Sequence, residues 1–418
     1  MKVSRIPSRW WLVMLMSIGI CINYIDRVNI SHAIVMIADE FKLSAFQQGI
    51  VLSAFSWGYV IFMAAGGLLV DRIGAVRTAS VAALAWSLAT AWTGLASNLA
   101  GLFCSRIAVG LGEAPIFPAN ARIVREEFPV YERGRATALF DAGSYMGTAL
   151  SAPLVVYTMV SFGWRWSFLA CALLGFLWVF LWQKNVPRLQ ATHSQPTHQP
   201  DLGVFWRKAF VQLLTERRVL GASLGFFCYN YAKSFFLTWF PSFLIKERGF
   251  SLLSVGYVGL LPPLCAIIGE LVAGWATDAM IQRGISVTVA RKTPLCLGLL
   301  LASTVGFSTV VTSQWVILLL LSFSFTATIA ASPGIWAIPG DIAPGPELVG
   351  TIGGIQNTFS NVAGIVAPVI TGAIVARTGS FEVALIVSAT VAILGAFSYW
   401  FIVGSLEPIS LNTFGENT

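Results

Sequence analysis

The sequence predicts an all-α membrane protein with twelve transmembrane helices in two six-helix bundles. Of its 418 residues, 56% are hydrophobic and only 11% are charged, and the mean hydropathy is +0.76. A soluble domain has about 25% charged residues. Twelve apolar segments reach the length of roughly 20 residues that a helix needs to cross a bilayer. A short motif also occurs twice, about half a chain length apart, which predicts two related halves.

The longest polar stretch separates six apolar segments from six more. The first six are centred near residues 20, 58, 87, 110, 147 and 174, and the last six near residues 232, 263, 303, 328, 362 and 392. The stretch between them is rich in Pro, Gln, His and Thr, which is typical of a solvated loop. The predicted domains are therefore an N-terminal bundle over residues 1–184, a cytoplasmic linker over residues 185–217 and a C-terminal bundle over residues 218–418.

The basic residues lie mainly in alternate connections. Most of the 26 Lys and Arg residues fall on the side of the predicted spans that holds the N-terminus. Because cytoplasmic loops carry an excess of Lys and Arg, both termini are predicted to be cytoplasmic, in a cell (inner or plasma) membrane. This distribution accounts for the net charge of +7, so no nucleic-acid partner is predicted. The first span lacks a small-residue cleavage site, so we expect no cleaved signal peptide.

Neither the cysteines nor the histidines form a pattern that indicates a metal site. The six Cys residues all lie in apolar segments without a CxxC motif, and the three His residues do not cluster. No nucleophile and base occur together near a predicted membrane surface. The sequence therefore predicts no cofactor and no enzymatic activity, and we expect a monomer embedded in the lipid bilayer.

The repeated motif follows the second and the eighth spans. Gly67 precedes Asp71 by four residues, and Gly274 precedes Asp278 by four residues. In both copies a basic residue and a glycine follow the Asp, namely Arg72 and Gly74 in the first copy. Residues four apart share one helix face. We expect the glycines to permit close helix approach and the charged residues to pair with helix ends and loop charges on the cytoplasmic side.

The stretch Gly66–Arg77 resembles the loop 2–3 motif of the major facilitator superfamily, and Glu132–Ala136 resembles its usual entry into the fifth span. Within that superfamily, several stretches are similar to the anion:cation symporter family. Members of this family import sugar acids and other small organic anions with protons, or move such anions across organelle membranes. The stretches are Asn23–Arg27, Arg106–Pro115, Phe117–Pro118, Leu237–Pro241 and Asp341–Pro344.

Four charged residues lie within predicted spans one and four. Asp26 and Arg27 are adjacent near the far end of the first span, and Arg106 and Glu113 are seven residues apart on the fourth. Seven residues return to the same helix face about 10 Å further along the axis. Ionisable residues at membrane depth usually face a protein interior or a water-filled path. They could alternatively form fixed buried ion pairs, for instance Asp26 with Arg106 or Arg27 with Glu113.

The resemblance implies roles for these four residues. In the family, the acids that match Asp26 and Glu113 couple the proton, and the arginines that match Arg27 and Arg106 bind or gate the anionic substrate. Burial favours a neutral carboxylic acid, whereas a nearby arginine favours the carboxylate. An acid would therefore bind or release its proton according to whether the arginine is occupied by a substrate carboxylate, and proton and anion would be coupled.

Further polar and aromatic residues on the same faces are candidate substrate ligands. Lys233 follows Tyr229 by one helical turn and is either a second cavity cation, which would favour a dianion, or a lysine that extends to the outer interface. At Ser144, related sugar-acid carriers often have a longer amide side chain. Hydroxyl, amide and Trp side chains suit a polyhydroxylated acid. The remaining candidates are Tyr24, Tyr59, Ser144, Trp336, Gln356 and Asn357.

The residues near the cytoplasmic ends of the spans are interpreted as gating elements. These are Asp71, Arg72, Arg135 and Asp278. The predicted function is a proton-coupled symporter that imports a small organic anion by alternating access, with a sugar acid (aldonate, aldarate or hexuronate) as the first candidate. The alternative is an exchanger or exporter of aromatic or dicarboxylic acids with the same fold.

Overall fold

The structure is a computed structural model that describes residues 8–186, 210–345 and 348–410. These residues are almost entirely helical, and no strand occurs among them. In chain order the elements are α1 (Ser8–Phe41), α2 (Ala45–Ile73), α3 (Ala75–Leu95), α4 (Leu99–Glu113), α5 (Ile116–Glu127), α6 (Val130–Phe162), α7 (Trp164–Asn185), α9 (Arg217–Thr238), α10 (Phe240–Lys246), α11 (Leu252–Val258), α12 (Leu261–Gln282), α13 (Val287–Ala302), the 3-10 helix η2 (Ser303–Thr309), α14 (Gln314–Ala330), α15 (Ser332–Ile342), α16 (Val349–Thr378), α17 (Glu382–Phe397) and the π-helix η4 (Ser398–Ile402).

Each of the twelve predicted spans falls on helical structure. Among the described residues, nine helical stretches are long and apolar enough to cross a membrane. The other three predicted spans, centred near residues 87, 232 and 303, coincide with α3, with α9 and with α13 followed by η2. The predicted class, an all-α membrane protein that crosses the bilayer several times, is therefore confirmed.

The chain forms two compact units. The first comprises the described residues of Met1–Gln195, Leu237–Leu264 and Pro368–Gly379, and the second comprises those of Pro196–Phe236, Cys265–Ala367 and Ser380–Thr418. Residues 187–209 of the predicted linker lie outside the described residues. The proposed bundle boundaries at residues 184 and 218 therefore remain predictions.

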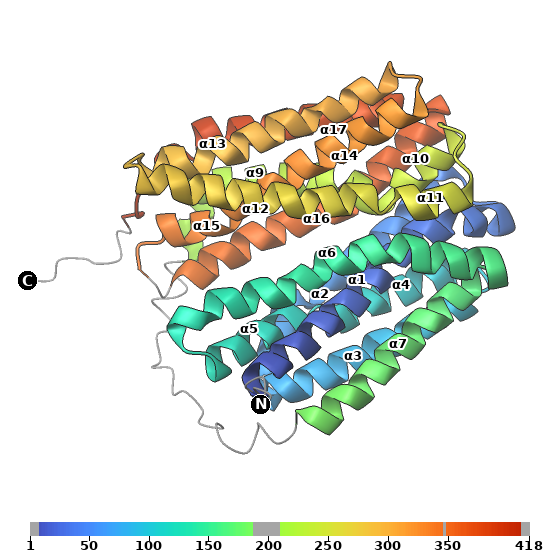
Figure 1. The fold of residues 1–418 in the computed structure, drawn as a ribbon, viewed down its shortest axis with the longest axis horizontal. Coiled ribbons are helices and arrows are strands. Elements are labelled where there is room, and N and C mark those ends of the chain that lie inside the picture. Colours follow the sequence, from blue (N-terminus) through green and yellow to red (C-terminus); the bar gives the residue numbers. More distant parts are fainter. Residues whose placement is uncertain (1–7, 187–209, 346–347, 411–418) are drawn as a thin grey trace, which may run out of the picture. The chain divides into compact units, whose positions relative to one another are not determined.

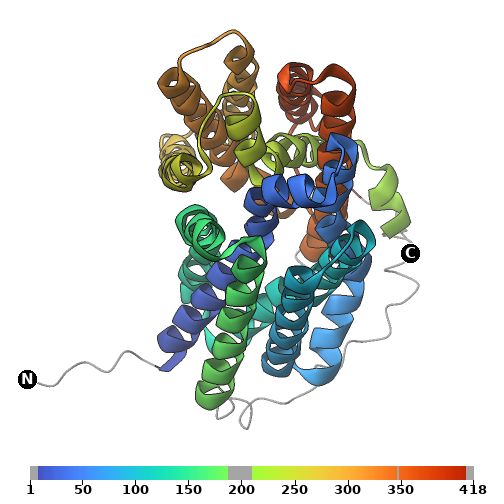
Figure 2. The ribbon, with the colours of Figure 1, turned by 90° about the vertical axis from the view of Figure 1, so that its right-hand side faces the viewer.

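Three helix pairs build the first unit. Helix α1 packs along α6, α2 along α4, and α3 along α7, while α10 and α11 contact α1 and α6 respectively (Figure 1). Figure 2 shows the same helices after a quarter turn. The buried core between them includes Trp86, Trp178 and Trp182. Trp178 also fixes α7 to α1, because its indole N–H donates to the Leu15 carbonyl at 2.8 Å.

Local sequence signals explain where these helices begin and end. Ser44 and Gln47 form a reciprocal capping box at the start of α2, which satisfies backbone donors that a helix N-terminus leaves free. Asn98 caps α4 by accepting from the Gly101 amide at 2.8 Å. Between α2 and α3 the chain turns at Gly74, whose φ of 85° suits glycine and strains most other residues. Gly74, which follows Asp71 and Arg72 of the repeated motif, thus makes this tight turn possible.

An ion pair joins one end of α1 to the start of α7. Arg165 donates through both terminal nitrogens to Glu40, at 2.9 and 2.7 Å, and the Trp164 indole N–H donates to the same carboxylate at 2.8 Å. The side chains of Arg165 and Glu40 are 39% and 42% exposed. A pair this exposed contributes at most about 1 kcal/mol to stability.

Glycines allow α2 and α4 to approach closely. A Cβ atom on Gly58 would overlap the Ile107 carbonyl oxygen, and one on Gly110 would overlap the Phe55 carbonyl oxygen. The expectation that Gly67 and Gly274 permit close approach is wrong, because no described atom lies within 4 Å of a Cβ built on either residue. Backbone contact between α2 and α4 instead occurs where Phe55 and the functional residues of α4 lie.

We predict that Gly110→Ala destabilises the protein and that Gly67→Ala does not. The new methyl group at position 110 would overlap backbone atoms of Phe55 and Tyr59. Because backbone cannot yield as a flexible side chain can, the cost lies toward the upper end of about 1–3 kcal/mol and exceeds the helix-propensity gain of about 1 kcal/mol. At position 67 only the gain applies. Thermal unfolding of the detergent-solubilised variants measures this, with a lower melting temperature expected for Gly110→Ala alone. Equal melting temperatures for the two variants would contradict the packing described here.

The second unit has its own core of small and aromatic residues. Ala232, Ala302 and Ala392 pack together from α9, α13 and α17. Lys292 of α13 is buried, and its ammonium group donates to the carbonyl oxygens of Trp400 and Gly404 at 2.8 and 2.6 Å. A cation at these free carbonyls stabilises the end of the last helix.

Candidate functional site

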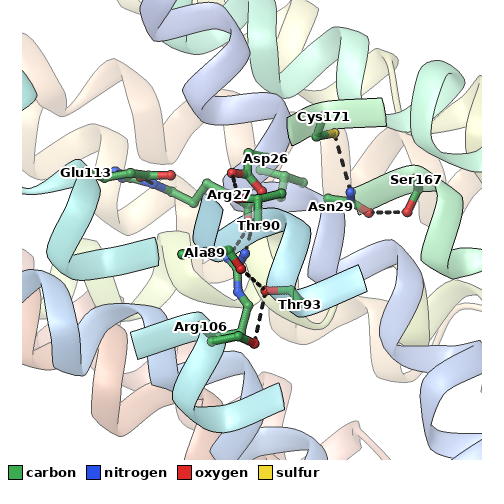
Figure 3. Close-up of polar contacts among 12 residues, drawn as sticks. Asp26, Arg27, Asn29, Ala89, Thr90, Thr93, Arg106, Glu113, Ser167 and Cys171 are labelled. Atoms are coloured by element: carbon green, nitrogen blue, oxygen red, sulfur yellow. Dashed lines mark hydrogen bonds and ion pairs between the residues drawn. The ribbon is translucent and has the colours of Figure 1, made fainter. Parts of the chain in front are cut away.

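Helix α1 carries the adjacent charges Asp26 and Arg27 into the interior of the first unit. One turn further on, Asn29 accepts a hydrogen bond from the Ser167 hydroxyl at 2.9 Å and donates to the Cys171 sulfur at 3.5 Å. These contacts to α7 fix the rotation of α1 about its axis (Figure 3). Asp26 is consequently buried and Arg27 is partly exposed.

Arg27 forms an ion pair with Glu113 at the end of α4. Its Nε and Nη2 atoms both donate to Glu113 Oε2, at 3.2 and 2.8 Å. The side chain of Glu113 is 0% exposed and that of Arg27 is 19% exposed. Glu113 Oε1 has no hydrogen-bond partner among the described residues. One oxygen of the buried carboxylate is therefore bound by Arg27, and the other is left unpaired.

Three aromatic rings surround the Arg27 guanidinium. Its central carbon lies 4.3 Å from the ring centre of Phe55, 4.7 Å from that of Tyr24 and 5.2 Å from that of Tyr59. Phe55 and Tyr59 come from α2 and stack on each other at 5.5 Å. Aromatic faces attract a cation, so these rings stabilise the Arg27 guanidinium at the position where it meets Glu113.

Asp26 pairs with Arg106 of α4 in the most buried part of the site. Arg106 Nη1 lies 3.7 Å from Asp26 Oδ1, and Arg106 Nη2 donates to the Arg27 carbonyl oxygen at 3.4 Å. The hydroxyl of Thr90 on α3 donates a hydrogen bond to Asp26 Oδ2 (Figure 3). Sequence reasoning missed Thr90, because a single threonine in an apolar helix carries no signal of its partner.

Both ion pairs that the sequence left open as alternatives are present in the structure. Arg106 and Glu113 share one face of α4 as predicted, and each meets a different partner on α1: Arg106 meets Asp26, and Glu113 meets Arg27. The four side chains carry two positive and two negative charges when all are ionised. This balance makes their joint burial tolerable, and removal of one charge from the cluster would leave another uncompensated.

Two other residues predicted as ligands in the first unit, Tyr24 and Tyr59, lie beside Arg27, and a third, Ser144, is buried on α6. Tyr24 and Tyr59 contact Arg27, as described above. Ser144 of α6 is buried, and its carbonyl oxygen accepts from the Thr148 hydroxyl at 2.8 Å. Asp141, also on α6, acts electrostatically on Tyr24. The structure therefore brings α6 polar groups to the same face of α1 that carries Tyr24.

The predicted ligands of the second unit have more varied surroundings. Lys233 lies with its ammonium 5.9 Å from the Tyr229 ring centre, as expected from their spacing. Trp336 is 56% exposed and meets Phe226 edge-on at 5.2 Å. The remaining two amide residues, on α16, bond to protein groups: Gln356 donates to the Ile335 carbonyl at 3.1 Å, and the side-chain oxygen of Asn357 accepts from Asn361 at 3.1 Å.

The predicted gating residues lie at helix ends. Arg72, Arg135 and Asp278 are exposed. Asp71 belongs to α2, but its side chain lies outside what the structure describes.

Comparison with known proteins identifies the family. The family model of the Major Facilitator Superfamily matches residues 16–368. A protein described as a probable galactarate/D-glucarate transporter of Escherichia coli strain K12 is 34% identical over 444 residues, which cover 98% of this chain and 98% of that protein. A D-galactonate transporter of Escherichia coli O6:H1 is 31% identical and covers 96% of this chain and 97% of its own length.

A solved structure shows the same fold. It is a bacterial homolog of the human lysosomal transporter Spinster, in an inward-facing and unoccupied conformation. It superposes with a TM-score of 0.79 at 17% identity and covers 95% of this chain and 97% of that one. The predicted resemblance to organic-anion transporters is confirmed by the first two relatives, and the helical fold is confirmed by the third. The chain belongs to the Major Facilitator Superfamily and is a multi-pass membrane transporter rather than an enzyme.

Proposed function

We propose that this transporter imports a small organic anion together with protons by alternating access, with a sugar acid (aldonate, aldarate or hexuronate) as substrate. The observation that carries the proposal is the pairing of Arg27 with Glu113. A partly exposed guanidinium, held between aromatic rings, is bound to a fully buried carboxylate. This arrangement places an anion-binding group in direct contact with a group that can take up a proton.

Competition for Arg27 provides the coupling. A substrate carboxylate that binds the guanidinium takes the place of Glu113 Oε2, because Nε and Nη2 are the atoms that both acids need. Glu113 would then be a buried carboxylate without a cation, which is strongly unfavourable, and it takes up a proton instead. Anion binding therefore favours proton binding, and by linkage proton binding favours anion binding to the same extent.

Asp26 is proposed as the second proton-coupling group, with Arg106 as its partner. Both side chains are almost completely buried, so Arg106 reaches a substrate only after it leaves Asp26. We therefore propose that Arg106 gates the site or forms a second anion contact. Tyr24, Tyr59 and Ser144 are proposed to contact substrate in the first unit. Lys233, Trp336, Gln356 and Asn357 are the proposed contacts contributed by the second unit.

The substrate class rests on the relatives as well as on the site. The relatives named above transport galactarate and D-glucarate or D-galactonate by their descriptions, and all three are polyhydroxylated acids. Tyrosine hydroxyls and a buried serine can bond hydroxyl groups, and the arginine fork can bond the carboxylate through two hydrogen bonds. Arg72, Arg135, Asp71 and Asp278 are proposed to gate access on the cytoplasmic side of the cell membrane, where we also place both termini.

An exchanger or exporter of aromatic or dicarboxylic acids is the second candidate. The rings of Tyr24, Phe55 and Tyr59 around Arg27 favour it, because aromatic faces pack well against a flat aromatic acid. Transport direction and proton movement distinguish this candidate from a symporter.

Uptake into proteoliposomes tests the proposal. With an alkaline interior, we expect labelled galactarate, galactonate or glucuronate to accumulate above its external concentration, and a protonophore to abolish the accumulation. The external medium should become more alkaline when substrate is added without an imposed gradient. Substrate exchange with no change in external pH would contradict symport and favour the exchanger.

A further inference from the structure

One hydroxyl side chain of α3, that of Thr90, has a different kind of acceptor from all the others on this helix. A serine or threonine inside a helix commonly donates to the backbone carbonyl four residues earlier. Thr90 instead donates across to another helix, to Oδ2 of Asp26. The other hydroxyl side chains of α3 all obey the rule: Thr78, Ser80, Ser87 and Thr93.

The bond from Thr90 is the one direct hydrogen bond that Asp26 receives from the described residues. Arg106 Nη1 approaches Oδ1 only to 3.7 Å, beyond hydrogen-bond length, and Oδ1 has no hydrogen-bond partner. Thr90 and Arg106 are both 0% exposed and Asp26 is 1% exposed. A buried carboxylate depends strongly on its hydrogen bonds, so the Thr90 hydroxyl, together with the charge of Arg106, stabilises the ionised form of Asp26.

We propose that Thr90 is a positioning residue that sets the proton affinity of Asp26. The inference rests on the proposed role of Asp26 in proton coupling. A hydroxyl can donate to the carboxylate and can accept from the neutral acid, but the charge-assisted bond is roughly twice as strong. Thr90 thus favours the ionised acid and allows Asp26 to release its proton, while the bond holds Oδ2 toward α3 and leaves Oδ1 facing Arg106.

The other groups near Asp26 are charged or weakly acidic and lie on helices other than α3. Arg27 lies next to Asp26 on α1, Arg106 and Glu113 act on it from α4, and Cys171 faces it from α7. Helix α6 contributes Asp141, which acts on Tyr24. A change at Thr90 therefore alters the hydrogen bond to Asp26 without altering the charges around it.

Three substitutions on α3 separate this role from packing. Thr90→Val keeps the shape of the side chain and removes the hydroxyl. Thr90→Ser keeps the hydroxyl and removes a methyl group. Thr93→Val is the matched control, because Thr93 is equally buried one turn away and donates to the Ala89 carbonyl and the Ser105 hydroxyl, not to an acid.

Two pH titrations of the full-length protein in liposomes measure the effect. The first follows galactarate uptake against external pH, and the second follows the infrared C=O band of the protonated acid that Asp26→Asn removes. Without the hydroxyl, Asp26 holds its proton more tightly and stays protonated to higher pH. We expect both midpoints to rise by about one pH unit in Thr90→Val, which is a tenfold change in proton affinity. They should stay at the wild-type value in Thr90→Ser and Thr93→Val.

The outcomes distinguish the inference from the proposed function. An unchanged infrared midpoint in Thr90→Val, or an equal shift in Thr93→Val, would overturn the role of Thr90. If wild-type uptake did not depend on pH, proton coupling itself would be wrong, and the infrared titration would still report whether Thr90 sets the proton affinity of Asp26. A variant that unfolds would lose the infrared band of the folded protein, and Thr90→Ser would then decide: a midpoint unlike that of wild type overturns the proposal.

Discussion

Replacement of Arg27 by lysine is expected to lower substrate uptake by about 100-fold. Lysine keeps the positive charge that balances Glu113, but it lacks the planar fork that meets a carboxylate through two parallel bonds. Arg27 uses Nε and Nη2 together on one carboxylate oxygen, and its guanidinium lies close to the rings of Phe55, Tyr24 and Tyr59. A loss of about 2–3 kcal/mol in binding corresponds to roughly 30–150-fold in affinity.

The matched control for this prediction is Arg165→Lys. Arg165 also binds a carboxylate of α1 through two nitrogens, but it does so at an exposed position on Glu40. An exposed pair contributes little, so uptake by this variant should stay within about twofold of wild type. Initial rates of galactarate uptake, corrected for the amount of folded protein in each liposome preparation, provide the comparison. If the Arg27→Lys variant took up galactarate at the wild-type rate, Arg27 would not be the carboxylate ligand.

The positions of the charged residues were predictable from the sequence, but their partners were not. The charges of Asp26 and Arg27 at membrane depth imply a polar interior because their exposure to lipid is unfavourable. The spacing of Arg106 and Glu113 places both on one face of α4. Which acid meets which arginine depends on the rotation of α1, and the contacts of Asn29 with Ser167 and Cys171 set that rotation. No pattern within one helix contains this information.

The partners of Thr90 and of the closely packed glycines were also not predictable from the sequence. The motif at Gly67 and Gly274 predicted the duplicated architecture, yet the close backbone contact of α2 with α4 occurs at Gly58 and Gly110. Glycine is common in membrane helices, and only the facing helix determines which glycine is needed. The same is true of hydroxyl donors, because Thr90 faces Asp26 whereas Thr93 faces Ser105. The helical spans themselves were predictable because hydrophobic length is a property of each segment alone.

Glu113→Gln is expected to abolish proton-driven accumulation and to preserve exchange. Glutamine retains the size of the side chain and an oxygen that can accept from Arg27, but it carries no negative charge, so the ion pair of Arg27 with Glu113 is lost. The amide cannot take up a proton, so anion binding no longer draws a proton into the site. The ratio of internal to external galactarate under an imposed pH gradient should fall to about one, whereas counterflow of labelled against unlabelled galactarate should continue within about threefold of wild type.

The same substitution should tighten substrate binding, because Glu113 no longer competes for Arg27. An affinity gain of about tenfold, or 1.4 kcal/mol, would appear as a larger ligand-induced rise in melting temperature than the wild-type protein shows at equal galactarate. Without ligand the variant should melt lower, since Arg27 has lost its charged partner in a partly buried position. Glu40→Gln, which removes the exposed carboxylate that binds Arg165, should change none of these quantities appreciably. Accumulation by Glu113→Gln at the wild-type level would remove Glu113 from the coupling mechanism, and loss of both accumulation and counterflow in a folded variant would make it a requirement for binding instead.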